Sequence, residues 1–114
     1  MAEQKGAMLK KEISIGRVSL TDRALFAKHL AAMLKSGVPI TEALATAADA
    51  ASGKLKKTVG AVLESVESGR SLSAAFSDYP NIFSGLFVQA TYAGEVSGTL
   101  VEKLENVAPQ PEKQ

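Results

Sequence analysis

The sequence contains no cysteine and no tryptophan, and it contains a single histidine. The absence of cysteine excludes disulfides, thiolate metal sites and a thiol nucleophile. His29 has no second histidine or cysteine with which to share a metal ion, so we interpret it as a residue at the edge of an apolar helix face. Aromatic residues make up only 5% of the chain, and Ala, Leu and Val carry most of the apolar content. This composition favours closely packed helices over a β-sandwich.

Long hydrophobic runs are also missing. No stretch approaches the roughly 18 to 20 consecutive apolar residues of a membrane span, and the lysines near the N-terminus are not followed by the apolar segment of a secretory signal. We therefore expect the chain as given to be soluble, with its 114 residues forming one domain around one core. The net charge is +1, and the basic excess lies within residues 1–17. The nearly neutral remainder disfavours nucleic-acid binding, for which a concentrated basic face supplies most of the affinity.

Serine–glycine pairs divide the chain at nearly regular intervals. They occur at positions 36–37, 52–53, 68–69, 84–85 and 97–98. Because glycine closes helices and serine caps them, this spacing predicts helices of about three turns. The expected helices cover residues 20–36, 39–51 and 54–68, a short segment from 72 that Pro80 stops, residues 83–96, and a last segment that begins near 99. The predicted fold is all-α, a six-helix bundle built from three helical hairpins over residues 19–108, with tails at 1–18 and 109–114.

Within each predicted helix, apolar residues recur every three or four positions, which predicts one buried stripe per helix. The predicted stripes contain Phe26, Leu30, Met33, Leu34, Ile40, Leu44, Ala48, Leu55, Val59, Val62, Leu63, Val66, Leu72, Ala75, Phe76, Leu86, Phe87, Ala90, Leu100, Leu104 and Val107. Ser19 and Ser71 are the predicted N-caps of the first and fourth helices. Candidates for apolar patches left exposed to a partner are Met33, Phe83, Phe87 and Tyr92.

No set of residues in the sequence supports catalysis. The segment Gly94–Gly98 places its serine three residues after the first glycine, whereas a nucleophile elbow needs a spacing of two and a preceding strand. The acidic pairs Glu64 with Glu67 and Glu102 with Glu105 are interpreted as solvated helix faces, because neither has the histidine of a di-metal carboxylate bundle. We therefore predict a protein that is not an enzyme and that holds no cofactor.

Several short segments occur in an informative order: SGVPITEAL at 36–44, GRSL at 69–72 followed by Ala75 and Phe76, and AGEVSGTL at 93–100. In this order they resemble the F domain of bacterial secretion and pilus platform proteins, over about residues 19–108. The resemblance implies a cytoplasmic domain, the first rather than the second copy, of a polytopic protein at the cytoplasmic face of the bacterial inner membrane. It implies a scaffold that couples a cytoplasmic assembly ATPase to extrusion of a pilus or pseudopilus. The implied partners are that ATPase, other inner-membrane assembly proteins, and further copies of the chain in a homodimer or higher homo-oligomer.

The matching segments contain the candidate structural and interaction residues, which are Gly37, Pro39, Gly69, Arg70, Gly94, Glu95 and Gly98. We interpret the glycines as helix terminators or points of close approach, and Pro39 as the first turn of the second helix. Glu95 opposes the dipole near the C-terminal end of its helix and so needs a partner. Two roles are open for Glu95: a cap for the next helix at Gly98–Leu100, or a contact with a neighbouring subunit or, as a weak candidate, a divalent metal ion. Arg70 is the candidate partner of Glu95.

The sequence fits two other function classes less well. A helical nucleic-acid-binding module would use Lys54, Lys56, Lys57 and the basic N-terminal tail, but these lysines lack the interleaved aromatic residues that stack on bases. A small helical enzyme or metal carboxylate protein would need a ligand set that the sequence does not contain. We therefore predict that the chain has no nucleic-acid partner.

Overall fold

A computed structural model describes residues 18–107 of the chain, and within this range it consists of six α-helices without strands. The helices are α2 (Leu20–Lys35), α3 (Ile40–Ala50), α4 (Gly53–Glu67), α5 (Leu72–Ser77), α6 (Gly85–Ser97) and α7 (Leu100–Val107). The all-α prediction is confirmed. The predicted tails at 1–18 and 109–114, apart from Val18, lie outside the described residues. No helix within residues 18–107 is both long and apolar enough to cross a membrane.

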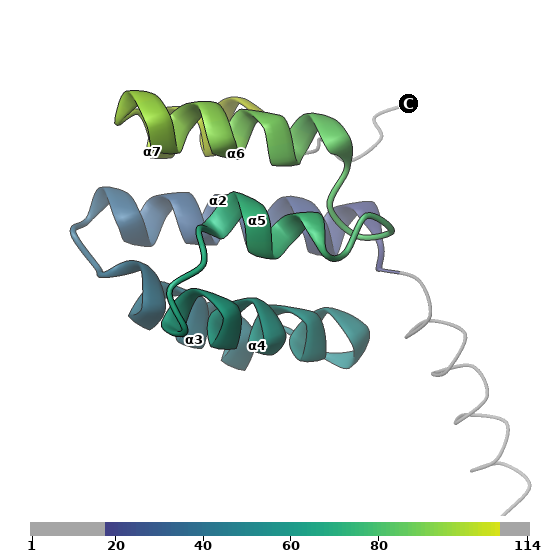
Figure 1. Cartoon of the computed structure of the whole chain (residues 1–114). Helices are drawn as coiled ribbons and strands as arrows, with labels where there is room; N and C mark the ends of the chain where they lie inside the picture. Colours follow the sequence, from purple (N-terminus) through teal and green to yellow (C-terminus); the bar gives the residue numbers. More distant parts are fainter. Residues whose placement is uncertain (1–17, 108–114) are drawn as a thin grey trace, which may run out of the picture.

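The six helices lie in three tiers (Figure 1). One outer tier consists of α6 and α7, the middle tier of α2 and α5, and the other outer tier of α3 and α4. Each helix packs against the next one in the chain, and α2 also packs against α7, so that the succession closes on itself. The predicted grouping into three hairpins is not confirmed, because α5 contacts both α4 and α6 while α2 contacts both α3 and α7.

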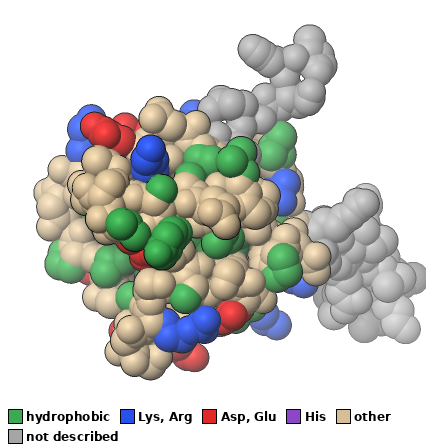
Figure 2. Space-filling model, turned by 45° about the horizontal axis from the view of Figure 1, so that its top comes forward, with side chains coloured by type: hydrophobic (Ala, Val, Ile, Leu, Met, Phe, Trp, Pro, Cys, Tyr) green, Lys and Arg blue, Asp and Glu red, His purple; other side chains and the backbone are tan. Residues whose placement is uncertain are grey.

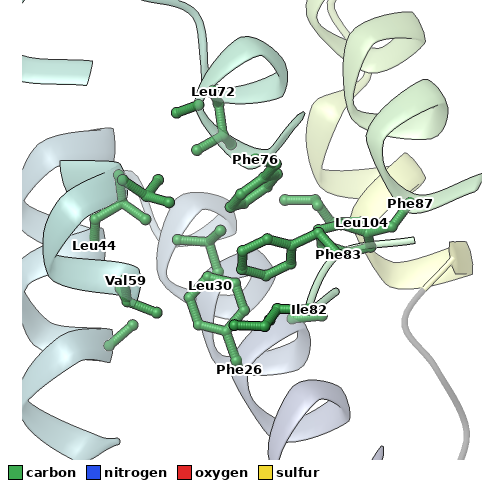
Figure 3. Close-up of a cluster of buried hydrophobic side chains, with 14 of the residues drawn as sticks. Phe26, Leu30, Leu44, Val59, Leu72, Phe76, Ile82, Phe83, Phe87 and Leu104 are labelled. Carbon is green, nitrogen blue, oxygen red and sulfur yellow. The ribbon is translucent and has the colours of Figure 1, made fainter. Parts of the chain in front are cut away.

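One core of buried side chains runs through all three tiers, and Figure 3 shows its main members. Its centre is a cluster of all four phenylalanines in the chain. The ring centroid of Phe76 lies 4.4 Å from that of Phe83, 5.1 Å from that of Phe87 and 6.1 Å from that of Phe26. Aromatic pairs at such distances contribute about 0.5–1.5 kcal/mol each beyond the burial of their area. Although α5 is only six residues long, it therefore supplies the ring that joins α2 to α6.

Serine side chains begin three of the helices. The Ser19 hydroxyl accepts a hydrogen bond from the amide of Asp22 at 3.0 Å, and the Ser71 hydroxyl accepts one from the amide of Ala74 at 3.1 Å. Both predicted N-caps are thus confirmed. Ser84 accepts from the amide three residues later in the same way, at 3.1 Å. As a result α6 begins at residue 85, two residues later than predicted.

Predictions for the residues around the start of α6 were partly wrong. Leu86, expected in the buried stripe, is 72% exposed, and Phe83, a candidate for an exposed patch, is only 4% exposed. Phe87 is 5% exposed, which confirms its place in the buried stripe and not in an exposed patch. The buried residues of α6 are Phe87, Thr91 and Gly94, and in a helix the position before 87 is turned about 100° away from them. Met33 is half-buried against the core, while the exposure of Tyr92 at 58% is confirmed.

Candidate functional site

The side chain of Glu95, near the end of α6, reaches across to the beginning of α5. Its Oε2 accepts hydrogen bonds from the backbone amides of Leu72 at 2.8 Å and Ser73 at 3.3 Å, and its Oε1 accepts one from the Ser73 hydroxyl at 2.6 Å. The first amides of a helix have no partner within that helix, and a negative charge is favourable beside them. The carboxylate opposes the dipole of its own helix and is stabilised by that of α5.

This geometry corrects both expectations for the partner of Glu95. The carboxylate does cap a helix, but the capped helix is α5 and not the one at Gly98–Leu100. The guanidinium of Arg70 binds elsewhere, since its Nη1 donates to Oδ2 of Asp78 at 2.5 Å and its Nη2 donates to the carbonyl of Ala74 at 3.2 Å. Arg70 lies just before α5 and Asp78 just after it, and because α5 has only six residues the long arginine side chain reaches the carboxylate.

The ion pair between Arg70 and Asp78 therefore spans α5 from end to end. The hydrogen bond from Arg70 lowers the pKa of the Asp78 carboxyl below its ordinary value, and the same bond raises the pKa of the Arg70 guanidinium. Both side chains are 43% exposed, so solvent screens the pair. We call the contacts of Glu95, Arg70 and Asp78 with α5 the α5 clamp, because together they hold both ends of this helix.

The turn from α6 to α7 depends on two glycines. A Cβ atom at Gly94 would lie 2.7 Å from the Cα of Leu100 and 3.1 Å from Cγ of Lys103, so the two helices approach too closely for any other residue. Gly98 follows α6 with φ 76°, a left-handed conformation that side chains disfavour. Backbone amides close this turn, because those of Gly98 and Thr99 both bond to the carbonyl of Gly94. The turn is thus closed without the carboxylate of Glu95.

The remaining predicted site residues lie at other turns. Gly37 and Gly69 follow α2 and α4 with φ values of 93° and 106°, and Pro39 is the N-cap of α3 with φ −61°. The structure therefore brings only part of the predicted set together: Gly94, Glu95 and Gly98 lie at one end of α6, and Arg70 lies just before the helix that Glu95 caps. Ser73 and Asp78 were not among the predicted residues. A basic and an acidic residue flanking a short helix are a signal that could have identified Asp78.

One of the three neighbouring lysines, Lys54, Lys56 and Lys57, forms a hydrogen bond within the domain. Nζ of Lys56 donates to the carbonyl of Ala48, near the end of α3, at 3.2 Å. The same carbonyl accepts a hydrogen bond from the amide of Ala51 at 3.2 Å, and a cation near the C-terminal end of a helix is favourable for the helix dipole. Lys57 is exposed and Lys54 is half-buried, and the basic tail lies outside the described residues. Within residues 18–107, no three His, Cys, Asp or Glu residues gather in a group that could hold a metal ion.

The outward face of α6, which we define by Leu86, Gln89, Tyr92, Ala93 and Val96, has a different character. All five residues are exposed, and the leucine and valine are 72% and 69% exposed. This face holds three of the four large hydrophobic side chains that are exposed within residues 18–107. Figure 2 turns the α6–α7 tier forward and shows hydrophobic side chains amid neutral surface, with charged groups mostly toward the edges of the view.

A pocket of about 280 Å³ lies beside this face and is lined in part by Leu20, Leu86 and Val107. Arg23 also lines it, and its Nη1 donates to the carbonyl of Ile82 at 3.4 Å. The pocket therefore brings the start of α2, the start of α6 and the end of α7 together at one place.

A sequence profile of the type II secretion system protein F family matches residues 26–113. The chain belongs to this family. It is 36% identical over 96 residues to the type II secretion system protein F of Vibrio cholerae, and this alignment covers 83% of this chain and 24% of that protein. It is 32% identical over 114 residues to the type IV pilus assembly protein PilC of Myxococcus xanthus, and this alignment covers 96% of this chain and 27% of that protein. The family resemblance inferred from the sequence motifs is confirmed.

Relatives of this protein F family member are thus named for two different systems. A further relative, the type IV pilus assembly protein PilC of Thermus thermophilus, is 33% identical over 117 aligned positions, with 98% of this chain and 29% of that protein covered. The chain spans about a quarter of the length of these curated relatives. It therefore corresponds to one part of such a protein.

Proposed function

We propose that this chain is a scaffold domain of a platform protein in the bacterial inner membrane, and that it serves type II secretion or type IV pilus assembly. The observation that carries the proposal is the match of residues 26–113 to the protein F family. In this role the domain lies at the cytoplasmic face of the membrane and is the first cytoplasmic domain of its parent protein. It links a cytoplasmic assembly ATPase to the extrusion of a pilus or pseudopilus, without catalysing a reaction itself.

The polar contacts of the domain support a scaffold role. Three charged side chains form hydrogen bonds at the two ends of α5, namely those of Glu95, Arg70 and Asp78. Their hydrogen bonds hold the helix that carries Phe76, and that ring lies in the centre of the core. A domain built in this way transmits displacement between its surfaces as a rigid body, because its tiers are joined through one packed core.

Three kinds of partner follow from the proposal: the assembly ATPase, neighbouring inner-membrane assembly proteins, and further copies of the chain. The exposed and uncharged face of α6 supports a role in protein contacts, since apolar patches rimmed by polar residues are typical of interaction surfaces.

A deletion experiment in the source bacterium tests the proposed function. Removal of the gene for the parent protein should abolish surface pili or the release of secreted proteins, and a copy that lacks residues 19–108 should not restore the lost activity. A copy with Leu25→Ser, a change at an exposed apolar residue away from α6, is the matched control and should restore it. Normal piliation and normal secretion in the deletion strain would contradict the proposal.

The link to the ATPase needs a separate measurement. The purified chain, immobilised through its N-terminus, should retain the assembly ATPase from the same bacterium, and an unrelated helical domain of similar charge should not. If the deletion abolishes pili or secretion but no ATPase is retained, the platform role stands and the coupling role of this domain is wrong.

A further inference from the structure

The pocket between α2, α6 and α7 combines an apolar lining with a single cation. Leu20, Leu86 and Val107 line it together with three rings of the phenylalanine cluster. Among the described residues of its lining, Arg23 is the only charged one, so no carboxylate there neutralises the guanidinium. A volume of about 280 Å³ lies just below the ~300–1,000 Å³ of small-molecule pockets, so the space admits one short chain or one head group.

The guanidinium of Arg23 has no strong contact within the domain. Its Nη1 donates to the carbonyl of Ile82 at 3.4 Å, which is longer than the usual range of about 2.7–3.2 Å for such a bond. Its Nε is buried, and no residue in the range 18–107 accepts a hydrogen bond from it. A buried donor of a charged group without an acceptor is unfavourable. The side chain therefore gains hydrogen bonds by turning toward an acceptor that enters the pocket.

An anionic oxygen attached to an apolar group is the chemical complement of this site. A guanidinium binds phosphate and carboxylate through two parallel N–H···O bonds, which would satisfy the donors of Arg23 that the fold leaves without good acceptors. The apolar part of the same ligand would displace water from Leu20, Leu86 and Val107. A phospholipid has both parts, a phosphate and an acyl chain.

The position of the pocket favours a ligand that comes from a membrane. The helices α2 and α6 begin at the same end of the domain (Figure 1), and Val107 brings the end of α7 to the same pocket. The start of α4 is close by, since Asp22 and Leu55 line a second pocket together. The segments that meet here, residues 20–23 and 47–57, contain four basic and two acidic residues. Such a surplus is attracted to the anionic surface of the cytoplasmic leaflet.

We propose that this pocket binds an anionic phospholipid, whose phosphate is held by Arg23 and whose acyl chain lies among Leu20, Leu86 and Val107. The inference rests on the proposed function, in which the parent protein is embedded in the membrane, and deepens it by naming the surface that contacts the lipid. Leu86 is 72% exposed and lies at the rim of the pocket, where it meets the bilayer surface. The bound lipid fixes which end of the domain faces the membrane.

A short-chain lipid tests the pocket without a bilayer. The full 114-residue chain, isotope-labelled for NMR, is titrated with monomeric dihexanoyl phosphatidic acid, and the amide signals of Leu86, Phe87 and Val107 should shift. Glycerol 3-phosphate has the same phosphate without acyl chains. It should bind at least about tenfold more weakly, because it buries no apolar surface in the pocket.

Substitutions separate the cation from the apolar lining. Arg23→Gln should weaken binding of the short-chain lipid by about tenfold or more, since hydrogen bonds between charged groups are strong. Lys28→Gln removes the same charge from an exposed position of the same helix and is the matched control, with unchanged affinity. Arg23→Lys keeps the charge without the planar fork and should give an intermediate affinity.

Folding of these variants is checked by circular dichroism. The helix content should not change, because the only hydrogen bond of Arg23 within residues 18–107 is the long one to Ile82. Leu86→Gln tests the apolar lining at an exposed position, where the substitution does not disturb the core, and it should also weaken binding of the lipid.

Vesicles distinguish a membrane lipid from a soluble phosphate. The chain should sediment with vesicles of phosphatidylglycerol but not with vesicles of phosphatidylcholine, and inorganic phosphate should not release it. The loss of vesicle binding should be larger for Arg23→Gln than for Lys28→Gln, because simple attraction to a charged surface depends on the number of basic residues near it.

Three results overturn the proposal. Equal losses for Arg23→Gln and Lys28→Gln mean that only net charge attracts the lipid. Equal affinities for glycerol 3-phosphate and the short-chain lipid mean that an anion binds without the apolar lining. Lipid binding that begins only after removal of residues 108–114 means that this segment covers the pocket in the full chain. Loss of pili or secretion in the deletion strain, together with any of these results, would leave the platform role intact and remove only this inference.

Discussion

The two faces of α6 differ in a way that is unusual for a surface helix. Such a helix normally turns apolar residues toward the core and charged residues toward water. On α6 the inward face combines the buried ring of Phe87 with the carboxylate of Glu95, while the outward face exposes Leu86, Tyr92 and Val96. The polar and apolar groups of the inward face are satisfied by contacts within the domain. The outward face has apolar surface that folding of a single chain does not bury.

Substitution of neighbouring residues should separate the two faces most strongly. Phe87→Ala removes a ring from the centre of the core and should lower the free energy of unfolding by about 3–5 kcal/mol. Leu86→Ala, one position earlier, should change it by less than about 0.5 kcal/mol, because that side chain is already exposed. Urea denaturation at micromolar concentration measures both changes. Similar losses for the two variants would mean that the faces do not differ as described.

The close approach of α6 and α7 predicts the next largest effect. Gly94→Ala should lower the free energy of unfolding by about 2–3 kcal/mol, because the new methyl group collides with the backbone of Leu100. Gly60→Ala, in the interior of α4 where no atom lies within 4 Å of the new methyl group, is the matched control. It should stabilise the chain by about 0.5–1 kcal/mol, since alanine is the better helix former. Equal effects at the two glycines would contradict the steric role of Gly94.

Removal of the carboxylate tests the charged part of the inward face. Glu95→Ala leaves the amides of Leu72 and Ser73 without their acceptor and should lower the free energy of unfolding by about 1–3 kcal/mol. Glu95→Gln keeps an acceptor without the charge and should lose less. Glu64→Ala, at an exposed position of α4, is the control and should change stability by less than about 0.5 kcal/mol. Amide hydrogen exchange at residues 72 and 73 should accelerate, and unchanged protection there would refute the cap.

The smallest effect concerns the exposed ion pair of the α5 clamp and depends on pH. The hydrogen bond from Arg70 lowers the pKa of Asp78 in the folded state, so the pair stabilises the fold fully above the unfolded pKa of about 3.9. This contribution is lost as the pH falls through the lower pKa of the folded state. The melting temperature should therefore be slightly higher for the natural chain than for Asp78→Asn at pH 6, and the difference should vanish in strong acid. A difference that is constant with pH would show that Asp78 acts by another route.

Local rules accounted for most of the fold, and non-local contacts for most of the errors. The caps at Ser19 and Ser71 were predicted because each hydroxyl bonds only three residues ahead. The partner of Glu95 was not predicted, because the amides that it binds, those of Leu72 and Ser73, lie 23 and 22 residues earlier in the sequence. Only the packing of α5 against α6 brings these amides close to the carboxylate. The error at Leu86 also had a non-local origin, since Leu86 and Phe87 are adjacent apolar residues and only the packing of α6 shows that Phe87 faces the core.

The packing of α2 against α7 has a mechanical consequence. Leu20, at the beginning of the described helices, and Val107, at their end, line the same pocket, so the chain enters and leaves the domain near one place. A tensile force between these two points acts first on the contact of α2 with α7, and it reaches α3 and α4 only after that contact has opened. Under the proposed function, the contact of α2 with α7 is therefore the one that resists pulling.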